Sequence, residues 1–203
     1  MTYTEIYSPV LYPMWLMSFI LLALVIDRLW FLRKSSIFDK NMISDIQMHA
    51  KNLEFDKALD RACVSGSLLG KAWSRGFREF LSGGTGLSEA LSESTYLMMA
   101  PLKRNITAIG TVASIAPLFG LLGTLIGLII IFSQLGGAGA DEKKQLAVGI
   151  GHALYSTIGG LAVAIPGIIF HRYFKSKLTG YSESAEYEIG IIRHNYMISG
   201  RKV

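Results

Sequence analysis

Cysteine, charged residues and catalytic motifs are scarce in this sequence, and each scarcity excludes a class of protein. Cys63 is the only cysteine, so the chain has neither a disulfide framework nor a cysteine-based metal site. Charged residues make up 17% of the 203 positions, against 51% hydrophobic residues, a balance typical of integral membrane proteins. A P-loop, an H-E-x-x-H helix and a pair of catalytic carboxylates are all missing. We therefore expect no enzyme activity, no cofactor and no metal.

The net charge of +5 does not indicate a nucleic-acid partner, because basic and aromatic residues are not interleaved as they are in RNA-binding modules. In a membrane protein such a surplus more often marks the cytoplasmic side. The first residues lack the basic start of a signal peptide and include Glu5. We therefore expect the first apolar run to remain in the mature chain.

Three stretches lack Asp, Glu, Lys and Arg and are long enough, alone or with the residues beside them, to cross a hydrocarbon core of about 30 Å. They are residues 10–26, which residues 29–32 extend, residues 106–134 and residues 148–170. Tyr12 and Trp30 lie near the two ends of the first stretch, where aromatic side chains favour the membrane interface. The sequence therefore predicts three transmembrane helices.

The region between the first two stretches is polar, with apolar residues at helical spacing and a glycine-rich loop at 82–86. This pattern predicts a small domain of about three helices in an all-α chain. The expected order is a periplasmic stub (1–9), a transmembrane helix (10–32), a cytoplasmic helical domain (33–104), a second transmembrane helix (105–134), a periplasmic loop (135–147), a third transmembrane helix (148–174) and a cytoplasmic tail (175–203).

Basic residues at the ends of the predicted helices set their expected orientation. Arg33 and Lys34 follow the first helix, Lys103 and Arg104 precede the second, and three more basic residues lie within 172–177. By the positive-inside rule these ends are cytoplasmic, so the N-terminal stub and the 135–147 loop face outward.

Small residues recur at helical spacing in the second and third predicted helices. They are Gly120, Gly123 and Gly127 in the second helix, and Gly149, Ala153, Ser156, Gly160, Ala164 and Gly167 in the third. Such patterns let two helices approach closely, and for the second helix a plain packing face is the simpler interpretation. Pro117 and Pro166 lie inside these helices and are expected to kink them.

Asp27, Arg28 and His152 are ionisable residues within or beside the predicted spans. Asp27 and Arg28 form an interfacial charge pair that fixes the depth of the first helix or, alternatively, contacts another subunit. His152 lies near the outer end of the third helix. A free imidazole has a pKa of about 6.5, so His152 can take protons from an outer compartment or simply lie at the water interface.

A single chain of three membrane helices has too little contact area to bury all its small residues. We infer an oligomer whose second and third helices surround a central space, with the first helix outside. Hydroxyl groups can replace the water ligands of an ion in such a space, and Thr124 and Thr157 are expected at similar depth. Proton coupling also needs a titratable group, either His152 or an acid brought in by a partner helix. The small residues expected to line the space are Gly120, Gly123, Gly127, Ser156 and Gly160.

At these residues the sequence resembles the ExbB/TolQ/MotA proton-channel proteins, in their ExbB/TolQ branch. The segments that carry the resemblance are Asp27-Arg28-Leu-Trp30, Ile115-Ala-Pro-Leu-Phe-Gly-Leu-Leu-Gly-Thr124 with Ile126-Gly-Leu128, Gly149-Ile-Gly-His-Ala-Leu-Tyr-Ser-Thr157, and Gly160-Leu-Ala-Val-Ala-Ile-Pro166. The order of helices and the lengths of loops over residues 10–175 also match.

The resemblance implies a homopentamer in the bacterial inner membrane, around the single helices of an ExbD/TolR-like dimer that supplies a pore aspartate. Proton flow would then do mechanical work on a TonB- or TolA-like protein that spans the periplasm. Thr124 and Thr157 match the family's two pore threonines, whereas the ExbB type often has glutamate where this chain has His152.

Three alternatives stay open at this point. The ion can be H⁺ or Na⁺, because a buried carboxylate suits both. The task can be TonB-type uptake or a TolQ-like role in envelope integrity. The chain can also be a membrane scaffold that assembles partners and conducts no ion.

Overall fold

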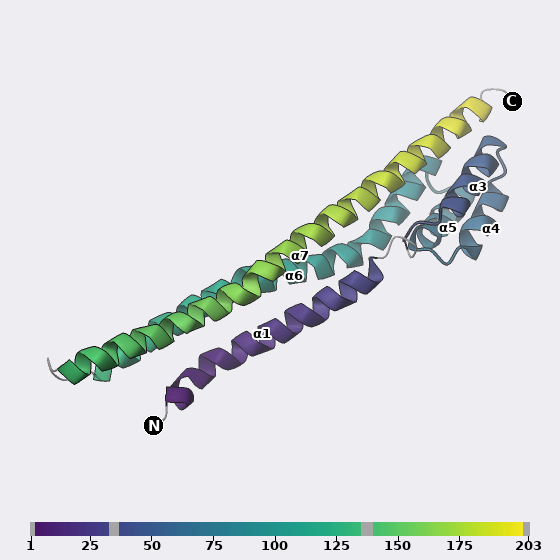
Figure 1. The fold of residues 1–203 in the computed structure, drawn as a ribbon. Coiled ribbons are helices and arrows are strands. Elements are labelled where there is room, and N and C mark those ends of the chain that lie inside the picture. Colours follow the sequence, from purple (N-terminus) through teal and green to yellow (C-terminus); the bar gives the residue numbers. More distant parts are fainter. Residues whose placement is uncertain (1–2, 33–36, 135–139, 201–203) are drawn as a thin grey trace. The chain divides into compact units, whose positions relative to one another are not determined.

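The computed structural model describes residues 3–32, 37–134 and 140–200, and every regular element within these ranges is a helix (Figure 1). The predicted all-α fold is therefore confirmed. The helices of this described part are α1 (Tyr3–Phe31), α3 (Lys40–Lys51), α4 (Phe55–Val64), α5 (Leu68–Leu81), α6 (Leu87–Gln134) and α7 (Ala140–Gly200).

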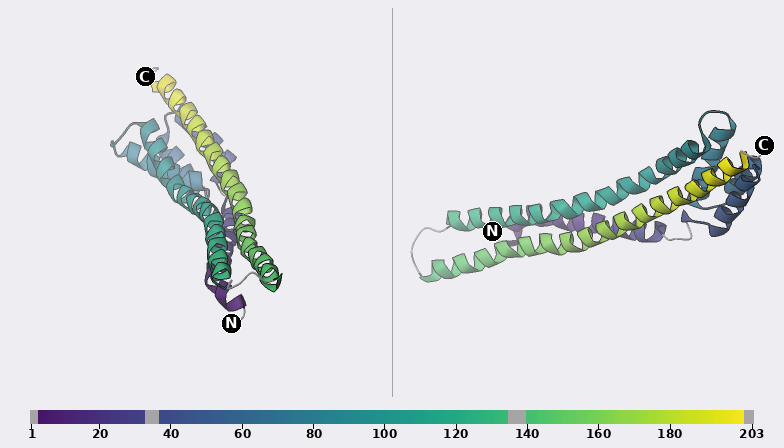
Figure 2. Two further views of the ribbon diagram at one scale, coloured as in Figure 1. Left: turned by 90° about the vertical axis from the view of Figure 1, so that its left-hand side faces the viewer. Right: turned by 90° about the horizontal axis from the view of Figure 1, so that it is seen from above.

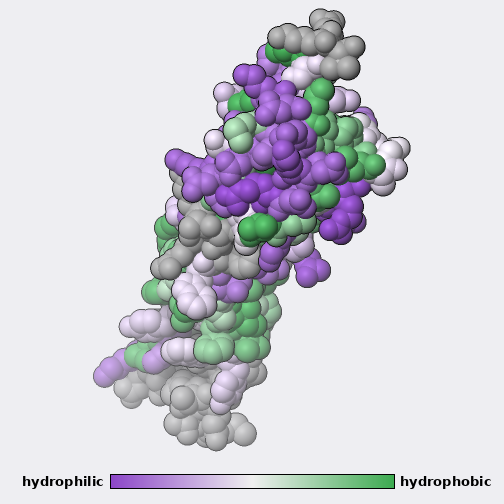
Figure 3. Space-filling model, turned by 90° about the vertical axis from the view of Figure 1, so that its right-hand side faces the viewer, coloured by the Kyte–Doolittle hydropathy of each residue, from purple (hydrophilic) through white to green (hydrophobic). Residues whose placement is uncertain are grey.

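The chain divides into two compact units, which we describe separately. The apolar unit consists of Met1–Asp27 and Ile106–Tyr173, and the polar unit of Arg28–Asn105 and Phe174–Val203. In the space-filling view, hydrophilic side chains gather over the short helices of the polar unit (Figure 3).

Among the described residues, three helices are long and apolar enough to cross a membrane, over Tyr12–Trp30, Leu87–Ser133 and Leu146–Ser199. Each of the three predicted spans falls largely within one of them. Large apolar side chains on these helices face outward, including Phe19 on α1 and Ile129 on α6, which are 71% and 68% exposed. Lipid or other protein must cover such a surface in a stable molecule, so the chain is a multi-pass membrane protein.

Helices α6 and α7 run side by side through the apolar unit (Figures 1 and 2), and glycine permits their close approach. A Cβ atom on Gly160 of α7 would lie 2.7 Å from the carbonyl oxygen of Ala116 on α6. Helix α1 packs on α7 in a similar way, because a Cβ on Gly159 would lie 2.7 Å from Cε of Met14. Small residues therefore serve as contact points for both neighbours of α7.

The polar unit has a hydrophobic core that includes Trp73 and Phe77 of α5 and Ile189 of α7, all nearly inaccessible to solvent. Asp39 caps the N-terminus of α3 by accepting hydrogen bonds from the N–H groups of Asn41 and Met42. Ser67 caps α5 by accepting one from Gly70. Such caps satisfy N–H groups that have no partner within the helix.

Two helix boundaries differ from the periodicity of the sequence. Apolar residues recur without interruption over 43–59, yet the structure separates α3 from α4 at Asn52–Glu54, where Leu53 has a φ of 59°. Helix α7 begins at Ala140, within the segment expected to be a loop up to residue 147, and continues to Gly200 through the predicted tail. Pro166 lies inside α7 and Pro117 inside α6.

Candidate functional site

Thr124 of α6 and Thr157 of α7 meet in the seam between these helices. Their hydroxyl oxygens lie 2.5 Å apart. Thr124 is 8% exposed, and Thr157 is half-buried. The structure thus brings together the two hydroxyls that the sequence placed at similar depth, and it shows them in contact within one subunit.

The backbone around the pair offers further acceptors. The Thr124 hydroxyl lies 3.0 Å from the carbonyl oxygen of Ala153 and 3.2 Å from that of Gly120. The Thr157 hydroxyl lies 3.4 Å from the same Gly120 oxygen. A hydroxyl has one hydrogen to donate and two lone pairs, so the arrangement has more acceptors than donors. When Thr157 donates to Thr124 and Thr124 donates to Ala153, Thr157 keeps a free lone pair.

Glycine holds the two threonines at this distance. A Cβ on Gly120 would lie 2.9 Å from the carbonyl oxygen of Ser156 and 3.1 Å from Cα of Thr157. Any larger residue would push the helix backbones apart and lengthen the contact between the hydroxyls. Gly123 and Gly127 are buried on the same helix.

Ser156 and His152 lie on other sides of α7. The Ser156 hydroxyl is 3.9 Å from Sδ of Met14, so it contacts α1 rather than the threonine pair. His152 is exposed, and its ring centroid lies 6.3 Å from that of Tyr155. Within the described residues, no group of three or more His, Cys, Asp and Glu side chains could hold a metal ion.

The remaining predicted positions lie at or inside long helices. Arg28 is 6% exposed, so its guanidinium is covered by protein and does not extend into the membrane interface. Asp27 is exposed. Pro117 is half-buried and Pro166 exposed. The roles of these residues in helix depth, subunit contact and kinking stay predictions.

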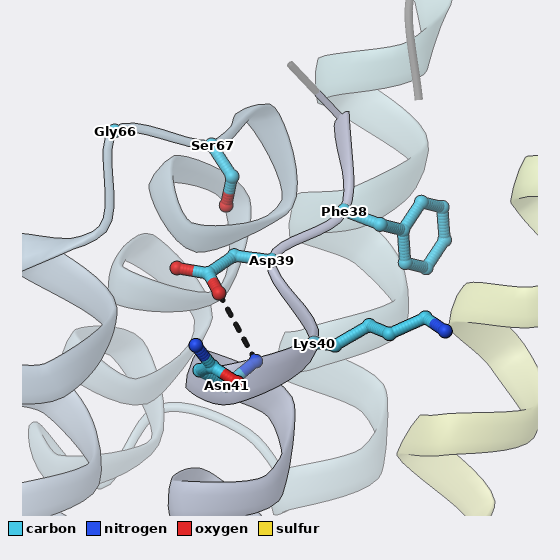
Figure 4. A pocket seen from close by; sticks show the side chains of 6 residues that line it. All are labelled: Phe38, Asp39, Lys40, Asn41, Gly66 and Ser67. Carbon is cyan, nitrogen blue, oxygen red and sulfur yellow. Dashed lines mark hydrogen bonds between the residues drawn. The ribbon is translucent and has the colours of Figure 1, made fainter. Parts of the chain in front are cut away.

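A pocket of about 410 Å³ opens in the polar unit, where the caps of α3 and α5 come together (Figure 4). Asp39 lines it, but the carboxylate already accepts hydrogen bonds from Asn41, Met42 and the hydroxyl of Ser65. The backbone N–H of Met42 makes the largest contribution to lowering the pKa of Asp39. We therefore assign this carboxylate to helix capping and not to ligand binding.

The carboxyl group of Glu188, between α3 and α7, has a raised pKa, in contrast to the lowered pKa of Asp39. Burial raises the pKa of Glu188, although the side-chain amide of Gln47 donates a hydrogen bond to it over 2.5 Å. The pKa rises because burial removes water that would stabilise the charged form.

His171 makes contacts that the sequence pattern does not predict. Its Nδ1 lies 2.8 Å from the carbonyl oxygen of Ile106 on α6. A signal was present in the spacing, because His171 follows Gly167 by one helical step in the small-residue stripe.

Comparison with known proteins gives the family. The family model of the MotA/TolQ/ExbB proton channel family matches residues 67–187, more than half of the chain. An ExbB-like biopolymer transport protein of Synechocystis sp. is 29% identical over 178 residues, which are 82% of this chain and 67% of that protein.

Two shorter matches are closer in sequence. The biopolymer transport protein ExbB of Helicobacter pylori is 40% identical over 82 residues, covering 40% of this chain and 57% of the relative. ExbB of Aquifex aeolicus is 40% identical over 77 residues, covering 38% of this chain and 52% of the relative. The matched parts thus span about half of these two relatives. The expectation of a transport protein rather than an enzyme is confirmed, and the chain belongs to the MotA/TolQ/ExbB proton channel family.

Proposed function

We propose that this chain is a subunit of an ion-driven motor in the bacterial inner membrane. Five copies would surround the single helices of an ExbD/TolR-like dimer, with α6 and α7 around the central space and α1 outside. Family membership supports a channel. Exposed apolar residues on α6 and α7, such as Leu125 and Ile158, support further contacts with lipid or with neighbouring copies.

The contact between Thr124 and Thr157 is the observation that carries the proposal. Thr157 can turn its hydrogen toward a partner's carboxylate, while Thr124 turns its own toward Thr157 or Ala153. When the carboxyl group is protonated, Thr157 can accept its hydrogen bond instead. A hydroxyl pair of this kind stabilises both protonation states of an inserted acid, as proton transfer through a low-dielectric region requires.

The small residues of the seam support the same role. Gly120 and Gly160 keep α6 and α7 so close that the hydroxyls can exchange partners by rotation about one bond. No helix has to move for this exchange. The seam would therefore serve as a rigid wall against which the partner's acid is protonated and released.

The predicted orientation has the basic ends of the helices in the cytoplasm. Ions that move down the gradient across the inner membrane would therefore flow toward these ends. One elementary charge that moves through 100 mV releases about 2.3 kcal/mol. Several protons per step would therefore suffice to move a partner helix. We propose H⁺ as the ion, in line with the family's description.

The relatives named ExbB-like or ExbB are biopolymer transport proteins. By analogy, the work would be passed to a TonB-like protein that spans the periplasm and opens outer-membrane uptake. A TolQ-like role in envelope integrity uses the same machinery with a TolA-like protein as the recipient.

Replacement of each threonine by valine tests the proposal, because valine keeps the shape and removes the hydroxyl. Hydrogen bonds to charged groups contribute about 1.5–3 kcal/mol, so proton flux should fall roughly 10- to 100-fold in Thr124→Val and in Thr157→Val. Flux is measured in vesicles that contain the assembled complex. Thr111→Val is the matched control, because its hydroxyl donates to the carbonyl oxygen of Thr107 within its own helix. Normal flux in both seam variants would reject the proposal.

A membrane scaffold without ion flux is the second candidate. The burial of Thr124 favours it, since a hydroxyl that bonds to Ala153 inside the subunit also suits a purely structural role. For a scaffold, both valine variants would keep their cellular function, whereas changes on the outer face of α1 would disrupt the complex.

A further inference from the structure

His171 of α7 is anchored to α6 by one of its two ring nitrogens. Its Nδ1 lies 2.8 Å from the carbonyl oxygen of Ile106. The ring lies against Gly110, where an added Cβ would come within 2.7 Å of both Cε1 and Nδ1. Because glycine leaves this space open, the imidazole fits directly against the backbone of α6.

The hydrogen bond determines which ring nitrogen carries the hydrogen. A carbonyl oxygen only accepts, so Nδ1 of His171 must donate. In the neutral ring Nε2 then has a free lone pair, and in the charged ring Nε2 also carries a hydrogen. The bond from Nδ1 to Ile106 therefore leaves Nε2 outside this contact.

The position of His171 relates it to the threonine pair. It continues the stripe of buried small residues on α7 and immediately follows the apolar run 148–170. Along an α-helix it lies roughly 21 Å from Thr157, at 1.5 Å per residue. His152 lies on the opposite side of Thr157 in the sequence, so a histidine stands toward each end of the span.

The ring of His171 packs on α6, one turn from the contact between α7 and α1. Helix α6 presents the Ile106 carbonyl and Gly110, neither of which titrates, and α1 contacts α7 one turn away through Leu21 at Gly167. The charged residues nearest in sequence to these contact points are Asp27 on α1, Lys103 and Arg104 on α6, and Arg172 on α7.

We propose that His171 is a fixed proton-exchange group at the inner end of the ion pathway. Neutral Nε2 takes a proton from hydronium in the pathway and leaves water, and the imidazolium then returns that proton to water on the cytoplasmic side. The bond from Nδ1 to Ile106 holds the ring in place through both steps. The inference rests on the proposed function, because it requires a proton to travel through the central space that α6 and α7 surround.

The test distinguishes the hydrogen bond between Nδ1 and Ile106 from the proposed proton exchange at Nε2. In His171→Asn the side-chain amide replaces the Nδ1–H donor and can keep the bond to Ile106, but it takes up no proton. His171→Leu removes both functions. Each full-length variant is assembled with the ExbD-like partner, and proton flux per assembled complex is measured in vesicles from pH 5 to pH 8, with Thr157→Val in parallel.

We expect His171→Asn to assemble normally and to conduct about a hundredfold less, the lower end of the effect of a positioned acid–base group. Imidazole added on the cytoplasmic side should restore its flux, which a purely structural defect would not allow. If the Asn variant does not assemble, His171→Gln, which also does not titrate, is measured in its place.

Native flux in the Asn or Gln variant, or reduced flux that imidazole does not restore, would overturn the role of His171. If flux is lost in Thr157→Val but native in His171→Asn, only this inference fails. If Thr157→Val and Thr124→Val both conduct normally, the proposed function fails as well.

Discussion

Gly120 and Gly160 face each other across the seam of α6 and α7, and a Cβ on Gly160 would lie 3.0 Å from Cα of Gly120. The atoms that block a larger residue belong to the backbone. They cannot move aside as a flexible side chain can. The seam therefore has little tolerance for added volume at this point.

Gly160→Ala should destabilise the protein by about 1–3 kcal/mol, the usual cost of overpacking a tight contact. The measurement is the midpoint of thermal unfolding of the purified protein in detergent. Gly151→Ala is the matched control on the same helix, because a Cβ there meets no atom within 4 Å. Equal midpoints for the two variants would show that the backbones are not as close as described.

His152→Ala should reduce proton flux less than Thr157→Val does. His152 is exposed, whereas Thr157 contacts Thr124 in the seam. Water can replace an exposed imidazole in proton transfer more readily than it can replace a hydroxyl between two helices. Proton flux is measured in vesicles at several pH values for both variants. A complete loss of pH-dependent conductance in His152→Ala would contradict the expected order of the two effects.

Asp39→Ala should lower the stability of the polar unit by roughly 0.5–2 kcal/mol, the effect of removing an N-cap side chain. The variant leaves the N–H groups of Asn41 and Met42 without their acceptor. Asp39→Asn is the control, because the amide oxygen can still cap the helix. Thermal unfolding at neutral pH compares the two, and equal losses would assign the effect to charge rather than to capping.

The stabilisation by ionised Asp39 should also depend on pH. Because its pKa is lowered on folding, this contribution is present above the unfolded pKa of about 3.8 and is lost as the pH falls through the folded pKa. Below that range, native protein and Asp39→Asn should unfold at similar temperatures.

Glu188→Gln should stabilise the polar unit at neutral pH. Burial raises the pKa of Glu188 above its usual 4.5, so the folded state binds a proton more tightly than the unfolded state. Stability then falls as the pH rises through the interval between the two pKa values. Glutamine keeps an acceptor for Gln47 and carries no charge.

The measurement is the unfolding midpoint of both proteins between pH 4 and pH 8. The advantage of the glutamine variant should disappear below about pH 4.5, where Glu188 is protonated in both states. A difference that does not change with pH would show that Glu188 is not buried as the structure describes.

Local patterns in the sequence were sufficient for the three spans and for the loop at 82–86, which separates α5 from α6. The charge-free runs of 106–134 and 148–170 reflect a composition that only a membrane helix needs. The break at Leu53 could not be predicted in this way, because the apolar spacing continues across it and a φ of 59° is unusual for leucine.

The sequence by itself determined that the chain is a helical membrane protein of the proton channel family, and it singled out Thr124 and Thr157. Only the tertiary structure decided that the two hydroxyls touch, that Ser156 turns toward Met14, and that His171 bonds to Ile106. Composition and spacing are properties of one helix at a time, whereas contacts depend on how two helices are rotated and how closely glycine lets them approach.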